Sequence, residues 1–366
     1  MTPARDRRPS GPGTKADRAR GGRDPSGDRP ALADPLDGPL SPEAGEDVHA
    51  PPVEAGAALP PSVAITGIAG NLGKKLAKLL HGDTRLVGID RRPFREKPKD
   101  VEHHQLDIRK NRLEEVFRRA RVDAIAHLGL KHDPRERASE AHSFNVAGTQ
   151  KLLDLAVRHR VGKVVLLSSA NVYGPLPGNP NFLPEETPLL GAARFPNVRD
   201  LIEVDMYVQS FMWKHPEVET VVLRPVNIVG PTVRNAPSNY LRLEHPLTVL
   251  GFDPMVQLIH EEDVCSAIAL ALRPGVRGVF NVTGPGEVPL STVLRELGRD
   301  PVPVPDFLLR ALARRLFDAR LSNYPPGEID YIQYLCAVDG SRFVRETGWT
   351  PKYSLRETIR SVLPPL

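Results

Sequence analysis

The chain has 366 residues, of which 40% are hydrophobic, and its 49 Lys and Arg residues against 45 Asp and Glu residues give a formal net charge of +4. This small positive excess does not indicate a nucleic-acid-binding protein, and no apolar run approaches the ~18 residues that a membrane-spanning helix needs. Two cysteines, Cys265 and Cys336, are too few for a disulfide framework or a four-ligand zinc site, so we expect a soluble cytoplasmic protein without a metal centre.

Residues 1–60 differ in composition from the rest of the chain. They hold eleven of the 38 prolines, together with many Gly, Asp and Arg residues and few large apolar side chains. Such a segment cannot bury enough apolar surface to offset the entropy of ordering the chain, so we predict a disordered tail. Its basic residues lack the apolar segment of a secretory signal. They are expected to be solvated or, alternatively, to attach weakly to an anionic partner.

Residues 61–225 alternate between short apolar runs and segments with apolar residues at helical spacing. This pattern predicts strands at 62–66, 85–90, 122–127, 163–168 and 220–223, and helices at 72–80, 113–117, 144–158 and 198–214. Strands that are apolar throughout and alternate with amphipathic helices are typical of a parallel sheet covered on both faces. The pattern therefore predicts a doubly wound α/β domain with a parallel Rossmann-type sheet.

The rhythm of the sequence changes after Pro225. Stretches rich in Pro, Asn and Gly carry isolated elements, which we predict as helices at 261–272, 290–297 and 307–321 and a strand at 278–283. Residues 226–366 are therefore expected to form a smaller C-terminal substrate lobe that is interleaved with the sheet. The arginines of the last helix are expected to form a solvated face rather than a nucleic-acid site.

The clearest chemical motif is the sequence Thr-Gly-Ile-Ala-Gly-Asn-Leu-Gly at residues 66–73, which leaves the first strand and opens the first helix. Gly67 permits a tight turn, Gly70 lets backbone N–H groups approach a pyrophosphate, and Gly73 lets the helix pack close to the strand. The helix N-terminus adds unpaired N–H donors and positive partial charge. The motif predicts a dinucleotide-phosphate site formed by Gly67, Ile68, Ala69, Gly70, Asn71, Leu72 and Gly73.

Asp90 closes the second predicted strand, 23 residues after Gly67. A carboxylate at this position accepts hydrogen bonds from the adenosine ribose hydroxyls and would repel a 2′-phosphate, which favours NAD. Arg91 and Arg92 follow directly and could bind that phosphate instead, so NADP stays an alternative cofactor.

Further motifs follow the glycine motif in order along the chain. They are His127-Leu128-Gly129, Asn145-Val146-Ala147-Gly148-Thr149, Ser168-Ser169-Ala170-Asn171-Val172-Tyr173-Gly174, Leu223-Arg224-Pro225-Val226-Asn227-Ile228-Val229-Gly230-Pro231, the His-Glu-Glu-Asp-Val sequence at 260–264, and Gly348-Trp349-Thr350-Pro351. Taken together with the glycine motif, this ordered set resembles the extended short-chain dehydrogenase/reductase family, the NAD-dependent nucleotide-sugar epimerases and dehydratases. The resemblance covers residues 61–365.

The resemblance implies an NAD cofactor, a small-molecule substrate such as a nucleotide sugar, and assembly as a homodimer. It also implies cofactor contacts at the ends of several strands and at the helix that braces the central strand. Beyond the glycine motif, the residues expected to bind the cofactor are Asp90, Arg91, Asp107, Ile108, His127, Leu128, Gly129, Asn145 and Pro225.

The catalytic pair of the family is missing. Its members remove a hydroxyl proton with a tyrosine whose pKa is lowered by a lysine four residues later, beside a serine that orients the substrate. Ser169 occupies the serine position, but a gapless alignment places Asn197 at the tyrosine and Leu201 at the lysine, and no tyrosine of this chain has a lysine four residues later. Since general acid–base catalysis contributes roughly 10²–10⁴-fold, ordinary epimerase turnover should be impaired.

Two hypotheses follow from this replacement. In the first, the protein is an NAD(P)-dependent epimerase or oxidoreductase with a rewired site, in which Ser169 orients a nucleotide sugar or a related hydroxyl or carbonyl substrate and Tyr173 or His132 moves the proton. In the second, it is a catalytically silent NAD-binding sensor or scaffold. Arg234, Asn239, Tyr240 and Arg242 of the substrate lobe could bind a diphosphate or could simply lie at the surface.

Overall fold

The structure, a computed structural model, describes residues 36, 58–131, 137–193, 198–319 and 326–363. The predicted tail of residues 1–60 lies outside the described residues, except for Leu36 and residues 58–60. Two residues of the predicted active site, His132 and Asn197, also lie outside them. None of the described helices is long and apolar enough to cross a membrane.

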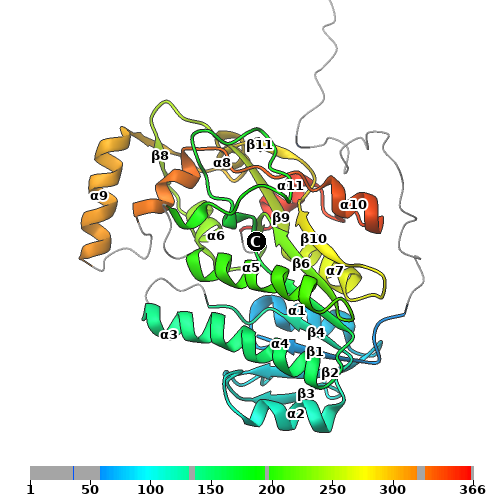
Figure 1. Cartoon of the computed structure of the whole chain (residues 1–366). Helices are drawn as coiled ribbons and strands as arrows, with labels where there is room; N and C mark the ends of the chain where they lie inside the picture. Colours follow the sequence, from blue (N-terminus) through cyan, green and yellow to red (C-terminus); the bar gives the residue numbers. More distant parts are fainter. Residues whose placement is uncertain (1–35, 37–57, 132–136, 194–197, 320–325, 364–366) are drawn as a thin grey trace, which may run out of the picture. The chain divides into compact units, whose positions relative to one another are not determined.

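A seven-stranded parallel sheet is the centre of the fold (Figure 1). Its strand order is β10-β6-β5-β4-β1-β2-β3, and all neighbouring pairs are parallel. The strands are β1 (Ser62–Thr66), β2 (Arg85–Asp90), β3 (Glu102–Gln105), β4 (Ala124–His127), β5 (Lys163–Leu167), β6 (Glu219–Pro225) and β10 (Gly278–Val282). The sheet confirms the predicted doubly wound α/β fold. The strand order reverses at β1 and β4, and such sheets bind ligands at the carboxyl ends of the strands at this point.

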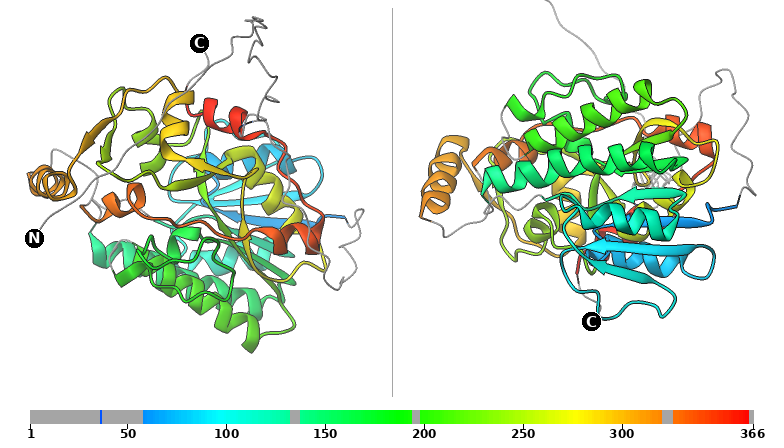
Figure 2. Two further views of the ribbon diagram at one scale, coloured as in Figure 1. Left: turned by 90° about the horizontal axis from the view of Figure 1, so that it is seen from above. Right: turned by 60° about the horizontal axis from the view of Figure 1, so that its bottom comes forward.

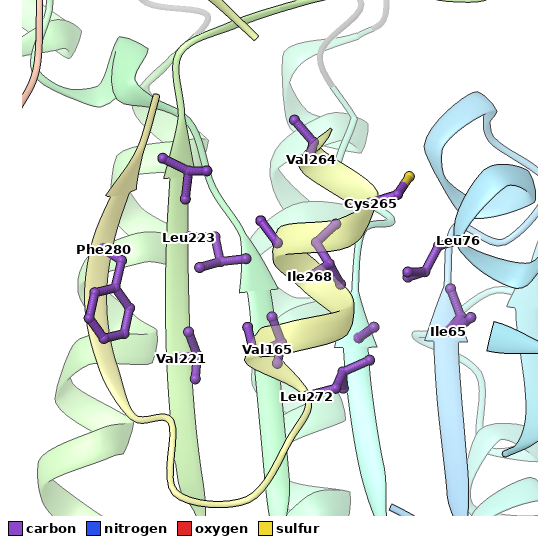
Figure 3. Close-up of a cluster of buried hydrophobic side chains, with 14 of the residues drawn as sticks. Ile65, Leu76, Val165, Val221, Leu223, Val264, Cys265, Ile268, Leu272 and Phe280 are labelled. Atoms are coloured by element: carbon purple, nitrogen blue, oxygen red, sulfur yellow. The ribbon is translucent and has the colours of Figure 1, made fainter. Parts of the chain in front are cut away.

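Helices cover both faces of the sheet (Figure 2). One layer contains α1 (Asn71–Leu80), α7 (Glu261–Ala271) and α10 (Ser341–Thr347), and the other contains α2 (Arg112–Ala120), α4 (Gly148–Arg158) and α5 (Arg199–Lys214). Successive side chains of β1 alternate between the layers, because Val63 and Ile65 join the core under α7 and Ala64 joins the core under α4. Figure 3 shows α7 across the first of these cores, with Cys265 on the side of the helix toward Leu76 of α1.

The helix predicted at 144–158 begins earlier than expected. The chain runs from α3 (Ala138–His142) through a π-helical turn (Ser143–Ala147) into α4 without a break. Such turns are often found at functional sites. This one carries Asn145, whose side-chain amide exchanges two hydrogen bonds with the backbone of Lys131, at 2.8 and 3.0 Å. The turn therefore fixes the segment that follows β4.

The sequence analysis missed one strand of the main sheet. β3 reads Glu-His-His-Gln and has no apolar run, because it is an edge strand whose side chains are exposed or only partly buried. It is held in the sheet by its backbone ladder with β2. The strand predicted at 122–127 is consequently the fourth strand of the chain, not the third.

The described residues from 226 to 363 contribute both to the main sheet and to two smaller sheets, and we call the part outside the main sheet and its covering helices the C-terminal lobe. β10 is a strand of the main sheet, and α7 packs against one face of that sheet. The remaining described strands form a three-stranded sheet of β7 (Asn227–Val229), β9 (Met255–His260) and β11 (Glu287–Pro289) and a two-stranded sheet of β8 (Leu247–Val249) and β12 (Val302–Val304). Around them lie α6 (Ala236–Leu241), α8 (Leu290–Glu296), α9 (Asp306–Asp318), the 3-10 helix η6 (Pro326–Ile332) and α11 (Leu355–Arg360).

Candidate functional site

The glycine motif forms a tight turn that is pressed against the end of β4. Gly67 has φ +75°, and a Cβ atom at this position would lie 2.7 Å from Cα of Gly129. The N–H of Gly70 donates to the carbonyl of Gly67 at 2.9 Å, and a Cβ atom at Gly73 would collide with that same carbonyl oxygen. Only glycine fits at residues 67 and 73, so the structure gives both glycines the packing roles that the motif predicts.

The N-terminus of α1 is open beside this turn. The helix begins at Asn71, and Gly70 at the N-cap position offers no side chain to bond the first backbone amides. The Asn71 side chain is directed away from these amides and donates to the carbonyl oxygen of Thr232 in the C-terminal lobe, at 2.5 Å. The free amides and the partial positive charge of the helix suit a phosphate group.

Asp90 lies next to this turn with its carboxylate buried. Oδ2 accepts from the backbone N–H of Ala69 at 3.1 Å, and Oδ1 accepts from the backbone N–H of Arg92 at 2.9 Å. The exposed guanidinium of Arg92 folds back over the same carboxylate, with Nη2 at 3.1 Å from Oδ2. The site therefore holds both the acid that favours a ribose hydroxyl and a cation that favours a phosphate.

Asp107 and Ile108 are less available to a ligand than the resemblance implies. Burial acts to raise the pKa of Asp107, but hydrogen bonds from Arg109 outweigh it, and the net pKa is lowered. Arg109 also bonds Glu140, with Nη2 at 2.7 Å from Oε1. Ile108 is buried against Gly148 of α4, where a Cβ atom would collide with its side chain. Asp107 is engaged by Arg109, and Ile108 belongs to the core.

Three cations surround one buried aromatic ring close to Asp90. The guanidinium of Arg91 lies 5.0 Å from the centroid of the Phe144 ring, that of Arg109 lies 5.7 Å away, and Nζ of Lys131 lies 5.1 Å away. These are distances at which cations are attracted to the face of a ring. Arg91 and Arg109 also pair with carboxylates, namely Glu140 for both and Asp107 for Arg109, so this group of cations is largely neutralised.

His127 braces the strand end and is not poised for proton transfer. Its ring is buried between the hydroxyls of Thr66 and Thr149, with Nδ1 and Nε2 at 2.6 and 2.9 Å from the two oxygens. Burial lowers its pKa to about 4, so the ring is neutral at physiological pH. The N–H of Leu128 donates to the carbonyl of Thr66, and the N–H of Gly129 donates to its hydroxyl. This network holds β1 and β4 in register beside the glycine turn.

The two serines at the end of β5 differ in their hydrogen bonds. Ser168 is buried and donates to Oδ2 of Asp205 at 2.6 Å. Ser169 is partly buried, caps the 3-10 helix η3 (Ala170–Val172), and accepts from the N–H of Asn171 at 3.2 Å. Because an accepting hydroxyl keeps its own hydrogen, Ser169 can still donate to a ligand. Pro225 ends the neighbouring strand β6 and is buried.

Tyr173 does not fit the predicted role of proton carrier. Its side chain is buried, and its hydroxyl donates to Oδ1 of Asn281 at 2.8 Å and accepts from Nη1 of Arg224 at 2.7 Å. Burial raises the pKa of Tyr173 to about 12. Arg224 in turn forms a fully buried ion pair with Asp205, at 2.7 Å. The hydroxyl is part of a structural network, and its proton is held rather than exchanged.

The position expected for the family's lysine is apolar in the structure as well. Leu201 lies in α5, is 5% exposed, and belongs to the core that α7 covers. The position expected for the tyrosine, Asn197, and the other candidate proton carrier, His132, lie outside the described residues. Near Ser169, the described part of the chain thus offers neither the expected cation nor a free phenol.

A cavity of about 270 Å³ lies in the C-terminal lobe, next to the segments that follow β5 and β6. Asn171, two residues after Ser169, and Asn227, two residues after Pro225, line one side of it. Side chains from α6, α8, α9 and η6 form the other walls, and most of them are aliphatic. The sequence analysis missed this cavity, although the helical spacing of Leu309, Leu312 and Leu316 was a signal that α9 presents an apolar face.

The arginines that could have bound a diphosphate are engaged elsewhere. Arg242 donates to the backbone carbonyls of Val362, Val233 and Gly230, at 2.8–3.0 Å. Arg234 donates to backbone carbonyls of its own loop. The hydroxyl of Tyr240 donates to the carbonyl of Leu247 at 2.9 Å. Asn239 is exposed. Arg234, Tyr240 and Arg242 thus bond the backbone of the lobe itself.

Two proteins of similar sequence match different shares of this chain. An uncharacterized protein of Mycobacterium tuberculosis, Rv0501, is 29% identical over 262 residues, which cover 71% of this chain and 70% of that protein. The UDP-glucose 4-epimerase of Dictyostelium discoideum is 32% identical over 162 residues, 43% of this chain and 42% of the epimerase.

Solved structures share the fold. A dTDP-glucose 4,6-dehydratase from Bacillus anthracis, in complex with NAD, has a TM-score of 0.65 at 20% identity and covers 82% of this chain and 95% of its own. A UDP-glucose 4-epimerase from Thermotoga maritima, with UDP-glucose, has a TM-score of 0.64 at 20% identity and covers 82% and 97%. Residues 63–283, from β1 to just beyond β10, match the family model itself. The chain belongs to the NAD dependent epimerase/dehydratase family.

Proposed function

We propose that this protein binds NAD at the glycine turn and acts on a small molecule at a carbon that bears a hydroxyl or carbonyl group. NAD, when bound, supplies the hydride acceptor or donor. The observation that carries the proposal is the juxtaposition of the open N-terminus of α1, the glycine turn packed on Gly129, and the carboxylate of Asp90. The family match and the neighbours crystallised with NAD support it.

Different residues of this chain bind the cofactor, orient the substrate and move the proton. The first amides of α1 hold the pyrophosphate. Asp90 accepts from the adenosine ribose hydroxyls once the exposed side chain of Arg92 moves aside. Ser169 donates its hydroxyl hydrogen to the substrate oxygen. His132 remains the candidate for the proton, because Tyr173 and His127 are both engaged and have pKa values far from neutrality.

A second candidate function is NAD binding without turnover. The observation that favours it is Leu201, an apolar core residue at the position where the family carries its lysine. Relatives and neighbours named for UDP-glucose and dTDP-glucose make a nucleotide sugar the substrate class to compare first. Nicotinamide absorbance, measured with a panel of alcohols, ketones and nucleotide sugars, separates the two functions.

The cofactor site is tested by removing one carboxylate. Replacing Asp90 by Ala should weaken NAD binding about 10–100-fold, because hydrogen bonds to a charged group contribute about 1.5–3 kcal/mol. The matched control is Asp83→Ala, an exposed residue in the turn before β2, which should leave the affinity unchanged. Isothermal titration with NAD measures both. An unchanged NAD affinity in Asp90→Ala, or no NAD binding by the unmodified protein, would contradict the proposal.

The proposed homodimer uses α5. Two large apolar side chains of this helix face outward, with Trp213 85% exposed and Met206 58% exposed. An isolated exposed apolar residue is ordinary, but two on one helix suit a symmetric interface. Sedimentation equilibrium of the protein and of its Trp213→Glu variant tests the assembly, and a monomer in both would refute it.

A further inference from the structure

The cavity of the C-terminal lobe is formed between two apolar cores. Leu258 and Leu290 line it and belong to the core of β9 and α8, whereas Leu309 and Ile329 line it and belong to the smaller core of α9 and η6. The walls from α8, α9 and η6 come after residue 283, where the family match ends. These walls therefore belong to the part of the chain that the family description does not cover.

The outer walls of the cavity are fixed to each other. Arg310 of α9 forms an ion pair with the buried Asp330 of η6 at 2.6 Å and donates to Oε1 of Gln333 at 2.5 Å. It also pairs with Asp306 one helical turn earlier, at 2.7 Å. This pairing directs the charge of Arg310 to η6 and leaves the apolar face of α9 for the cavity. Figure 1 shows α9 (orange) at the outer edge of the lobe.

A few polar groups interrupt the apolar lining. Asn171, Asn227 and Glu328 are among the lining residues, and in the described part of the chain none of their three side chains makes a hydrogen bond. Burial raises the pKa of Glu328 to about 7. Ligand pockets in proteins typically combine an apolar lining with a small number of unpaired polar groups that fix the orientation of the ligand.

The charge of the cavity excludes a diphosphate. None of its described lining residues is a lysine or an arginine, and the one carboxylic acid among them, Glu328, is negative when it ionises. Two arginines that flank α6, Arg234 and Arg242, donate to backbone carbonyls. Placing phosphate groups in apolar surroundings beside a carboxyl, without a cation, is strongly unfavourable.

The volume points to a compact ligand. A cavity of about 150 Å³ lined by aliphatic side chains binds benzene, and drug-sized pockets measure about 300–1,000 Å³. The cavity here, at about 270 Å³, lies between these cases, so a compact ligand would fill it.

We propose that this cavity binds a compact, largely apolar alcohol or ketone, whose oxygen is recognised by Asn171, Asn227 and Glu328. The inference rests on the proposed function, because the ligand is then the substrate held beside Ser169, and it names a substrate class different from the nucleotide sugars of the relatives. Apolar contacts with α8, α9 and η6 provide the binding, and the three polar groups orient the reacting end.

The experiment follows binding of N-phenyl-1-naphthylamine, a neutral aromatic probe that fluoresces in apolar surroundings, to the full-length protein without cofactor. We expect saturable binding and displacement by menthol and menthone, with weaker displacement by the hydrocarbon menthane because it lacks the oxygen. UDP-glucose and dTDP-glucose should not displace the probe. Displacement by either nucleotide sugar at lower concentration than menthol would overturn the inference.

A pair of variants on α9 locates the binding. Ala313 lines the cavity, and Ala311 is exposed on the same helix and does not line it. Ala313→Trp should weaken probe binding at least tenfold, whereas Ala311→Trp should leave it unchanged. If Ala313→Trp lowers the melting temperature so far that binding cannot be measured, Ala236→Trp, which fills the cavity from α6, takes its place. Equal probe binding by the filled and unfilled proteins would overturn the inference.

The tests of the cavity ligand and of NAD binding can fail independently of each other. Probe binding is measured without NAD, and NAD binding at Asp90 is measured without the probe. A protein that binds NAD but not the probe or menthol contradicts only the apolar substrate. A protein that binds menthol but not NAD contradicts the proposed function.

Discussion

The glycine turn and the apolar cavity both adjoin the carboxyl edge of the main sheet, but they are built differently. The turn is made from backbone: Gly67 against Gly129, and the open amides of α1. The cavity is lined by residues that eight separate helices and strands contribute. A site made of backbone requires glycine at fixed spacing and leaves a mark in the sequence. A cavity of side chains requires only that several apolar residues meet, and many sequences satisfy that condition.

The same contrast applies to the residues that the family resemblance predicts: this chain retains those of one region and replaces those of the other. The end at which we propose that NAD binds keeps the glycines of the turn and the carboxylate of Asp90 at the end of β2. At the end where we propose that the substrate reacts, Leu201 lies in the core, and the hydroxyl of Tyr173 is bonded to Asn281 and Arg224. We infer that NAD binding and the choice of substrate can be altered independently in this protein.

The largest effect is expected at Gly67. Gly67→Ala places a methyl group 2.7 Å from the backbone of Gly129 in addition to the left-handed backbone conformation at φ +75°. The conformation costs about 1–2 kcal/mol and the overlap about 1–3 kcal/mol, so the free energy of unfolding should fall by about 2–5 kcal/mol and NAD binding should be lost. Denaturant unfolding and NAD titration measure these two losses.

Gly82→Ala is the matched control for Gly67. Gly82 also has a positive φ, +91°, but a Cβ atom there would meet no other atom within 4 Å. This variant should lose only the conformational part of the stability and should bind NAD normally. If both variants behave alike, close packing of the turn against β4 is not what the motif requires.

The next effect concerns Glu328 in the cavity. Its pKa is raised by burial to about 7 in the folded protein, above the ordinary value of 4.5. Between these two values the folded state binds more protons than the unfolded state, so stability falls as pH rises through this window, and the full penalty persists above pH 7. With one pKa unit worth about 1.4 kcal/mol, the penalty is about 2–4 kcal/mol.

Glu328→Gln removes that titration. Its free energy of unfolding should match that of the parent protein near pH 4.5, the ordinary pKa, and should exceed it increasingly up to pH 7. Urea unfolding at a series of pH values measures this difference. The other titratable side chains that line the cavity, Tyr240 and Tyr331, have pKa values raised by burial and stay neutral throughout. If the difference in free energy of unfolding between the two proteins does not vary with pH, the pKa of Glu328 is not raised by burial.

The limits of the sequence analysis have the same physical origin as the contrast between the two regions. The glycine motif, the apolar strands and the alternating helices could be predicted, because backbone geometry and sheet burial restrict the residue types at each position. β3 was missed, because an exposed edge strand needs no apolar run. Tyr173 was read as a catalytic candidate because it follows Ser169 closely, whereas its setting depends on Arg224 and Asn281, far away in the chain.

The smallest effect separates packing from chemistry at Tyr173. Tyr173→Phe removes the hydroxyl that Asn281 and Arg224 share, and each loses one partner inside the core. The free energy of unfolding should fall by about 1–3 kcal/mol, the cost of leaving a buried polar group unsatisfied. NAD affinity and any turnover should be retained. The control is Tyr207→Phe on α5, whose hydroxyl makes no hydrogen bond to the described residues, and its stability should be unchanged. If Tyr173→Phe instead reduces turnover by about 10²–10⁴-fold while its stability stays high, the phenol carries the proton and the reaction end is less altered than the buried network indicates.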